Sequence, residues 1–357
     1  MSRGGPRCSA REPPPTDRDR RPWSGRAGRR PPAGRPSWPP ARAHGETQPA
    51  STPRSSSVRS PRALTTAAIS SGVGFVTVIG RIGGLRAVSK VAPVIRTTTS
   101  DDGVFTIVLD RPEAKNALTI EMRDDLLAAV RRARSDAGVR AVLLTGTGDA
   151  FCAGMDLRAS TVAQAGGEGF DTRSTSEALR TGVQAVVRDL WELDKPTVAA
   201  VNGTAVGPGA HLALSCDFVL VHEDTRFAWT FARWGLVVDA GGAYLLPRLV
   251  GLPRAKAMVL LGEGVKGSEA VDLGLAYKCV PAGDLRTEAE ALTAKLAAGP
   301  TRSLGLSKQL LNRTFETYLA SALELEGQFQ SLATTSSDLA EGMAAFREKR
   351  SPRFTGR

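Results

Sequence analysis

The pattern of apolar residues is regular only from about residue 103 onward. Short runs rich in β-branched residues predict strands at 104–109, 139–144, 197–201 and 217–221. Between the first two runs, Thr119 is placed to cap a helix whose apolar residues recur at helical spacing. Another helix is expected to begin near Gly209. Strands that alternate with helices in this way predict an α/β fold.

The C-terminal region carries only helical patterns. No strand pattern follows about residue 280, and helices are expected over about 302–319 and 322–349, with an irregularity near Ser336 and Ser337. We therefore divide the ordered chain into an α/β core, 96–299, and a helical region, 300–357. The helical region is expected either to cover the sheet or to contact other subunits.

Residues 1–95 have the composition of a disordered tail. Of the 22 prolines in the chain, 13 lie between Pro6 and Pro61. Residues 1–95 also carry 17 basic and 4 acidic side chains, so their net charge of +13 exceeds the +11 of the whole chain. The remainder is slightly acidic, which argues against nucleic-acid binding by the core. The weakly apolar stretch 64–80 is too rich in Ser and Gly to favour a membrane span.

Three interpretations of the tail remain open. It is a targeting segment, a basic arm, or sequence upstream of a true start near Val88 or Val91, which requires a non-AUG codon because no Met lies between Met1 and Met122.

Neither the four cysteines nor the three histidines form a metal-ligand pattern, so we expect reduced thiols, a cytoplasmic protein and no metal. These residues are Cys8, Cys152, Cys216, Cys279, His44, His211 and His222.

Two glycine-rich segments lie where predicted strands end, at 151–157 and 202–209. Turns of this kind expose backbone N–H groups, and two of them facing each other could hold one carbonyl oxygen as negative charge develops on it. The same glycines could instead serve only tight turns. A nucleotide-phosphate loop is less well supported, because no GxGxxG or Walker pattern occurs.

Four segments together closely resemble the enoyl-CoA hydratase/isomerase family, also called crotonases. They are RPEAKNAL at 111–118, FCAGMDL at 151–157, KPTVAAVNG at 195–203 and DAGG at 239–242, and the resemblance runs from about residue 94 to 353. It implies a crotonase-like ββα superhelix, C-terminal helices that form a homotrimer or hexamer, and an acyl-CoA thioester as substrate. Coenzyme A is then part of the substrate, and no separate cofactor is expected.

The resemblance also implies two backbone donors for the thioester oxygen. The first corresponds to Met155. The second, in the turn Gly207-Pro208-Gly209, corresponds to Pro208, which has no N–H. If Pro208 is the first residue of a helix, the amide of Gly209 or of Ala210 is the expected substitute.

The family's two water-activating glutamates correspond to His211 and Phe231, so hydration by two carboxylates is not supported. Asp239 corresponds to the carboxylate of the family's isomerases, and aromatic neighbours are expected to raise its pKa into the range of a general base. Two alternatives stay open. Asp239 could cap a helix starting near Ala240, and His211 could be either an acid/base group or a hydrogen-bonded wall residue.

For coenzyme A, the resemblance implies contacts from the turn Lys115, Asn116, Ala117 and Leu118, and from Phe346 and Lys349 toward a neighbouring subunit. We therefore expect an enoyl-CoA isomerase with Asp239 as acid/base. The alternatives are a hydratase that uses His211 and Asp239, and a protein that binds acyl-CoA without turnover.

Overall fold

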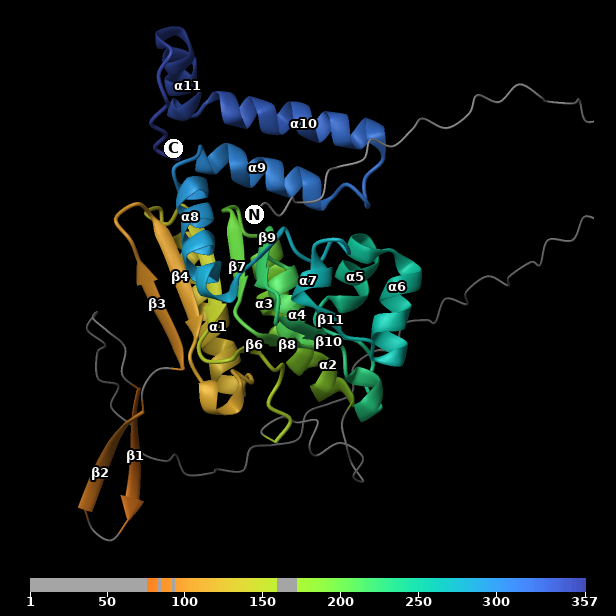
Figure 1. The fold of residues 1–357 in the computed structure, drawn as a ribbon. Coiled ribbons are helices and arrows are strands. Elements are labelled where there is room, and N and C mark those ends of the chain that lie inside the picture. The colour runs from red at the N-terminus through yellow and green to blue at the C-terminus, as the bar shows by residue number, and fades with distance from the viewer. Residues whose placement is uncertain (1–75, 83–84, 92–93, 159–171) are drawn as a thin grey trace, which may run out of the picture. The chain divides into compact units, whose positions relative to one another are not determined.

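The computed structural model describes residues 76–82, 85–91, 94–158 and 172–357, and these belong to one unit, Ser70–Arg357. Its larger sheet has the strand order β12-β9-β7-β5-β4-β3 and is parallel except for β3 (Figure 1). The strands are β3 (Ile95–Thr99), β4 (Val104–Leu109), β5 (Ala141–Gly146), β7 (Thr197–Val201), β9 (Phe218–His222) and β12 (Lys278–Val280).

The smaller sheet determines where the glycine-rich segments lie. Its order is β11-β10-β8-β6, and β6, β8 and β10 are parallel. The strands are β6 (Ala150–Cys152), β8 (Thr204–Val206), β10 (Arg226–Ala228) and β11 (Val265–Lys266). Because β6 and β8 are parallel neighbours, the turns that follow them emerge at the same edge of the sheet.

Helices surround both sheets. In the core they are α1 (Ile120–Ser135), α2 (Thr172–Thr181), α3 (Val183–Trp191), α4 (Pro208–Leu214), α5 (Gly242–Val250), α6 (Leu252–Lys256), α7 (Gly267–Ala270) and α8 (Leu285–Ala297). Three 3-10 helices are described, η1 (Pro112–Ala114), η3 (Phe231–Trp234) and η5 (Ala282–Asp284), and η4 (Ala257–Leu261) is a π-helix. Thr119 caps α1 as predicted, since its side chain accepts a hydrogen bond from the Met122 amide at 3.2 Å.

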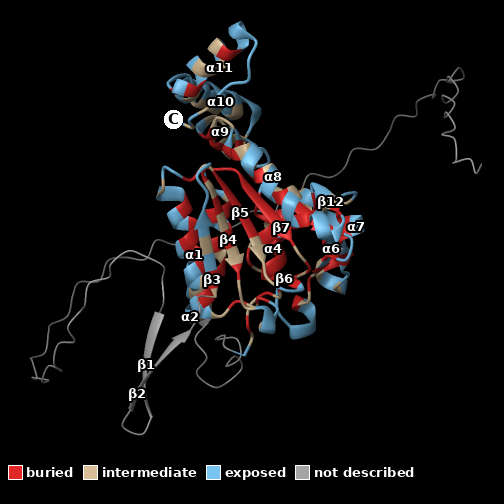
Figure 2. Cartoon of the chain, turned by 60° about the vertical axis from the view of Figure 1, so that its left-hand side comes forward, coloured by how far each residue is buried: buried red, intermediate tan, exposed pale blue. Residues whose placement is uncertain are grey.

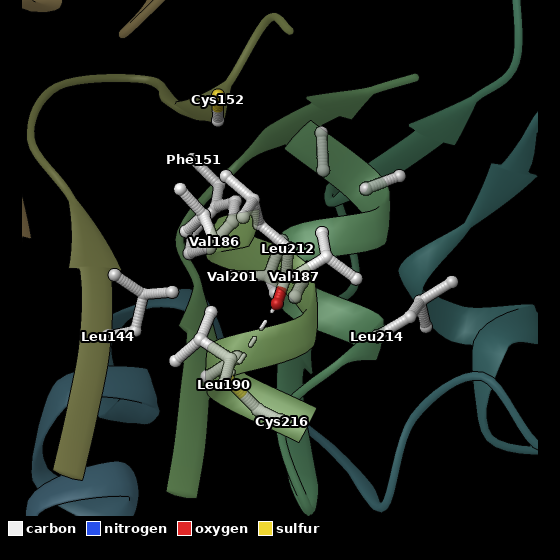
Figure 3. Close-up of a cluster of buried hydrophobic side chains, with 14 of the residues drawn as sticks. Leu144, Phe151, Cys152, Val186, Val187, Leu190, Val201, Leu212, Leu214 and Cys216 are labelled. Atoms are coloured by element: carbon white, nitrogen blue, oxygen red, sulfur yellow. Dashed lines mark hydrogen bonds between the residues drawn. The ribbon is translucent and has the colours of Figure 1, made fainter. Parts of the chain in front are cut away.

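The main core lies between the larger sheet and helices α1, α3 and α4. Figure 3 shows part of it, where Leu144 and Val201 from the sheet meet Val186 and Leu190 of α3 and Leu212 of α4. A second apolar cluster lies on the opposite face of the sheet, where α8 packs on β5, β7 and β9. Figure 2 shows the result: the central strands β5 and β7 are buried. The predicted α/β fold is confirmed.

Three helices follow the core: α9 (Thr301–Asn312), α10 (Leu319–Thr334) and α11 (Ser337–Glu348). The helix predicted over about 302–319 ends earlier than expected, because a turn occupies residues 313–318. The irregularity near Ser336 is confirmed, since Ser336 caps α11. No residue of α10 is buried. Figure 2 shows the largely exposed surface of these helices.

One part of the predicted disordered tail differs from expectation. The structure pairs β1 (Val76–Ile82) with β2 (Leu85–Val91) as an antiparallel hairpin. Five of the seven residues of β1 are β-branched, which favours a strand, whereas β2 has two, Val88 and Val91. Val94 and Ile95 of the expected tail are also described, and Ile95 begins β3. Residues 1–75, 83–84 and 92–93, including Cys8 and His44, lie outside the described residues.

Candidate active site

A pocket of about 350 Å³ opens where β6 and β8 end. Segments far apart in sequence form its wall, and Asp239 is the one carboxylate among the described residues that line it. The lining residues are Ile120, Arg123, Ala153, Gly154, Met155, Leu157, Thr175, Ala178, Leu179, Val183, Val206, Gly207, Pro208, Thr230, Phe231, Trp234, Leu236 and Asp239.

The backbone on both sides of Met155 is held by hydrogen bonds to Leu118. The Leu118 amide donates to the Gly154 carbonyl at 2.8 Å, and the Asp156 amide donates to the Leu118 carbonyl at 2.8 Å. Within the described chain the Met155 amide itself donates to no acceptor. A free amide on a fixed backbone at the wall of a pocket suits a ligand carbonyl oxygen.

The facing turn, residues 207–209, offers fewer free backbone N–H groups. Pro208 is the first residue of α4, and the Gly207 amide is already used, since it donates to the Ala228 carbonyl at 2.8 Å. Gly209 packs against β6, because a Cβ atom there would lie only 2.2 Å from the Cys152 carbonyl oxygen. Gly207 and Pro208 line the pocket, while Gly209 is buried behind them.

Asp239 meets the pocket with an unsatisfied carboxylate. Its Oδ1 is buried and has no hydrogen-bond partner among the described residues. Burial raises the pKa of Asp239 to about 6, although its own backbone amide opposes that shift. The predicted direction of this pKa shift is confirmed, and Phe231 and Trp234 are the aromatic residues that share the pocket.

The alternative that Asp239 caps a helix near Ala240 is wrong. Helix α5 begins at Gly242, its N-cap is Gly241, and no side chain caps it. The intervening turn is held by the Gly242 amide, which donates to the Asp239 carbonyl at 2.9 Å. Ala240 has a φ of 47°, in the left-handed region that a residue with a Cβ seldom adopts.

His211 is fully buried and does not line the pocket. Its Nε2 accepts a hydrogen bond from the Trp229 indole at 3.1 Å, and its ring stacks on Phe231 with centroids 5.9 Å apart. Burial lowers the pKa of His211 to about 4. Phe231 therefore faces the pocket, and a neutral imidazole lies behind it.

The turn predicted to contact coenzyme A, residues 115–118, lies beside Met155, because its last residue, Leu118, bonds to the backbone on both sides of Met155. Lys115 and Asn116 both have left-handed φ values, 51° and 56°. The Asn116 side chain is buried and committed to the fold, since it donates to the Thr147 and Ala150 carbonyls and accepts from the Arg111 amide. The backbone amides of all four turn residues already donate within the fold. The exposed Lys115 side chain and the carbonyl oxygens of the turn therefore remain for a ligand.

Phe346 and Lys349 do not reach this pocket from their own chain. Phe346 is 81% exposed, and Lys349 is an exposed residue that ends α11. No residue of α9, α10 or α11 is among the described residues that line the pocket.

Sequence reasoning missed the wall formed by α1 and α2. Ile120 and Arg123 come from α1, and Thr175 and Leu179 come from α2. In each pair the spacing of three or four residues places both side chains on one helical face. That spacing was a usable signal in α1, whereas α2 itself was not predicted.

Comparison with known proteins identifies the family of this fold. The model of the family described as enoyl-CoA hydratase/isomerase matches residues 99–357. The chain belongs to the enoyl-CoA hydratase/isomerase family. The crotonase fold expected from the four segments is therefore confirmed.

The relatives within this family have mixed names. A protein of Rhodobacter capsulatus named "Probable enoyl-CoA hydratase" is 40% identical, over 72% of this chain and 96% of its own length. The 1,2-epoxyphenylacetyl-CoA isomerase of Escherichia coli is 38% identical, over 72% of this chain and 97% of its own. The crystal structure of an enoyl-CoA hydratase from Mycobacterium smegmatis matches with a TM-score of 0.67 and 33% identity, over 73% and 99% of the two chains.

Two further features bear on partners. No helix in the described segments is long and apolar enough to cross a membrane. No group of three metal-ligating side chains occurs within the same segments.

Proposed function

We propose that this enzyme moves a double bond in an enoyl-CoA thioester, with Asp239 as the single acid/base. The observation that carries the proposal is that Asp239 is the one carboxylate among the described pocket residues, with an unpartnered Oδ1 and a raised pKa. A carboxylate in such surroundings is a stronger base than an exposed one.

In the proposed reaction Asp239 removes a proton from C2 of a 3-enoyl thioester. The electron pair moves toward the thioester oxygen and gives a dienolate, whose negative oxygen accepts a hydrogen bond from the free Met155 amide. Asp239 then returns the same proton to C4, so that the double bond lies between C2 and C3. One carboxylate is enough for this transfer.

Hydration is the rival reaction, and the name of the Rhodobacter relative favours testing it. Adding water requires groups that hold and activate it, and the two positions for these are His211 and Phe231. Phe231 has no titratable group, and His211 is buried behind it. Crotonyl-CoA hydration measured beside 3-hexenoyl-CoA isomerisation separates the two reactions. An inert protein that still binds acyl-CoA would support the non-catalytic alternative.

The variant Asp239→Asn tests the proposal directly. We expect its isomerisation kcat to fall at least 100-fold, because acid–base catalysis typically contributes about 10²–10⁴-fold. The Asn side chain has nearly the same shape and removes a buried charge, so the fold is expected to persist.

Asp272→Asn is the matched control, because Asp272 is exposed and lies outside this pocket. Full activity in Asp272→Asn and loss in Asp239→Asn support the assignment. Unchanged turnover in Asp239→Asn would refute it.

We also propose that the exposed apolar side of the C-terminal helices is the contact between subunits, as the family resemblance implies. A groove of about 760 Å³ lies among α9, α10 and α11. Leu319, Leu323 and Leu332 of α10 are 75%, 56% and 46% exposed. In such an assembly Phe346 and Lys349 would reach the coenzyme A bound by a neighbour.

A further inference from the structure

His211 has no chemical part in the proposed reaction, yet it touches the residues that carry it. Its ring stacks on Phe231 at an interplanar angle of 6°. It also lies directly against Gly242, because a Cβ atom at Gly242 would be 2.2 Å from the imidazole Cε1. His211 thus supports both a wall of the pocket and the turn that follows Asp239.

The hydrogen bond to Trp229 determines where the imidazole carries its proton. An indole N–H can only donate, so Nε2 of His211 must be the acceptor and has no hydrogen. Because burial keeps the ring neutral, the hydrogen is on Nδ1. Nδ1 is buried without a partner at hydrogen-bond distance. The Asp239 backbone still acts on the ring, since it raises the pKa of His211 against the larger effect of burial.

The carboxylate of Asp239 has little support of its own. No described side chain holds its Oδ1, so the main chain of its own turn sets its position. That turn contains Ala240 at a φ of 47° and Gly241 at 79°. A strained turn persists only where neighbouring groups hold it, and the His211 ring is packed directly against it.

We propose that His211 is a positioning residue, which holds the Asp239–Gly242 turn and thereby places the Asp239 carboxylate in the pocket. Trp229 is its partner, because the indole fixes the orientation and the tautomer of the imidazole. The effect of this placement on turnover rests on the proposed function, whereas the placement itself does not.

The test uses His211→Phe, which keeps a ring of similar size and removes both nitrogens. We expect KM for 3-hexenoyl-CoA to stay within about twofold and kcat to fall about tenfold. Trp229→Phe removes the same hydrogen bond from the other side. It is expected to lower kcat similarly, and the double variant is expected to lose no more than the larger single loss. His211→Gln can accept from Trp229 and donate from its NH₂ group, so it should regain part of the rate.

A second readout does not need turnover. In NMR spectra of protein with ¹³C-labelled aspartate, the carboxyl signal that is missing from Asp239→Asn belongs to Asp239. The change of this signal with pH gives the pKa of the Asp239 carboxyl. We expect this pKa to be lower in His211→Phe than in the wild type, because a loosened turn admits water to the carboxylate. If the wild type isomerises no 3-enoyl thioester, the proposed function fails, and this titration still decides the positioning role.

Two results would overturn the inference. One is a folded His211→Phe with wild-type kcat and an unchanged pKa of Asp239. The other is a further fall of tenfold or more when His211→Phe is added to Asp239→Asn, since that would make His211 an acid/base in its own right. If His211→Phe does not fold, Trp229→Phe supplies the same comparison.

Discussion

Pro208 and Asp239 affect the rate of the proposed reaction in opposite directions. Asp239 has a buried carboxylate oxygen without a partner, which favours proton removal in the proposed reaction. Pro208 occupies a donor position of the facing turn and has no N–H, while Gly209 behind it is packed against Cys152. The Met155 amide is then the main donor to the thioester oxygen, and we expect a slow enzyme.

Restoring a backbone N–H at position 208 tests whether the missing donor limits the rate. Losing one oxyanion donor typically costs about 2.7–4 kcal/mol of barrier, so Pro208→Ala is expected to raise kcat at least tenfold. Pro253→Ala, at the start of α6 and away from this pocket, is the matched control. Steady-state isomerisation of 3-hexenoyl-CoA measures both. An unchanged kcat in Pro208→Ala would show that another donor already serves.

The raised pKa of Asp239 predicts the pH dependence of the reaction. A general base acts only when deprotonated, so kcat/KM should fall about tenfold per unit below pH 6 and level off above it, since burial raises the pKa of Asp239 to about 6. A kcat/KM profile from pH 4.5 to 8 measures this. A midpoint near the ordinary value of about 4 for an exposed aspartate would contradict the burial of this group.

At the scale of the elements, the parallel pair β6 and β8 brings together the two glycine-rich turns of the pocket. A buried lysine of α9 binds this helix to the larger sheet. Lys308 Nζ lies 3.0 Å from Asp217 Oδ2 and 3.3 Å from the Leu190 carbonyl oxygen. Asp217 in turn accepts from the Thr197 amide at 2.8 Å. One ion pair therefore joins the C-terminal helices to β7 and the start of β9.

Removing this cation should destabilise the chain more than removing an exposed one. We expect Lys308→Met to lower the free energy of unfolding by about 2 kcal/mol, because it removes the charged donor that Asp217 and the Leu190 carbonyl share. Lys295→Met on α8 is the control, since Lys295 is exposed and its loss should cost less than about 0.5 kcal/mol. Urea unfolding followed by circular dichroism compares them. Equal midpoints would show that the ion pair does not stabilise the fold.

For the whole molecule, the exposed leucines of α10 predict self-association. We expect light scattering after size exclusion to give a mass near three chains, or six, for the wild type. Leu323→Glu is expected to give smaller species, because it places a charge in the groove among the C-terminal helices. Leu261→Glu, at a residue 73% exposed in η4, is the control. A wild type that runs as a monomer would contradict the proposal.

Much of the fold follows from local pattern. The strands 104–109 and 197–201 are where the β-branched runs predict them, and Thr119 caps α1 as its position indicates. The strand predicted at 139–144 begins two residues later, because the Val139 amide is used in a turn with the Asp136 carbonyl. Helix α2 was not predicted.

The sequence was enough to name Met155, Pro208 and Asp239 as the candidate site, because they lie in segments that resemble the motifs of a known family. A carboxylate or a missing N–H at such a position is a local property of the sequence. What needed the folded chain is which of these groups share one cavity. Burial decides that Asp239 meets the pocket while His211 is closed off behind Phe231. Solvent access and the pairing of distant polar groups arise only when separate segments pack together, and no local pattern encodes them.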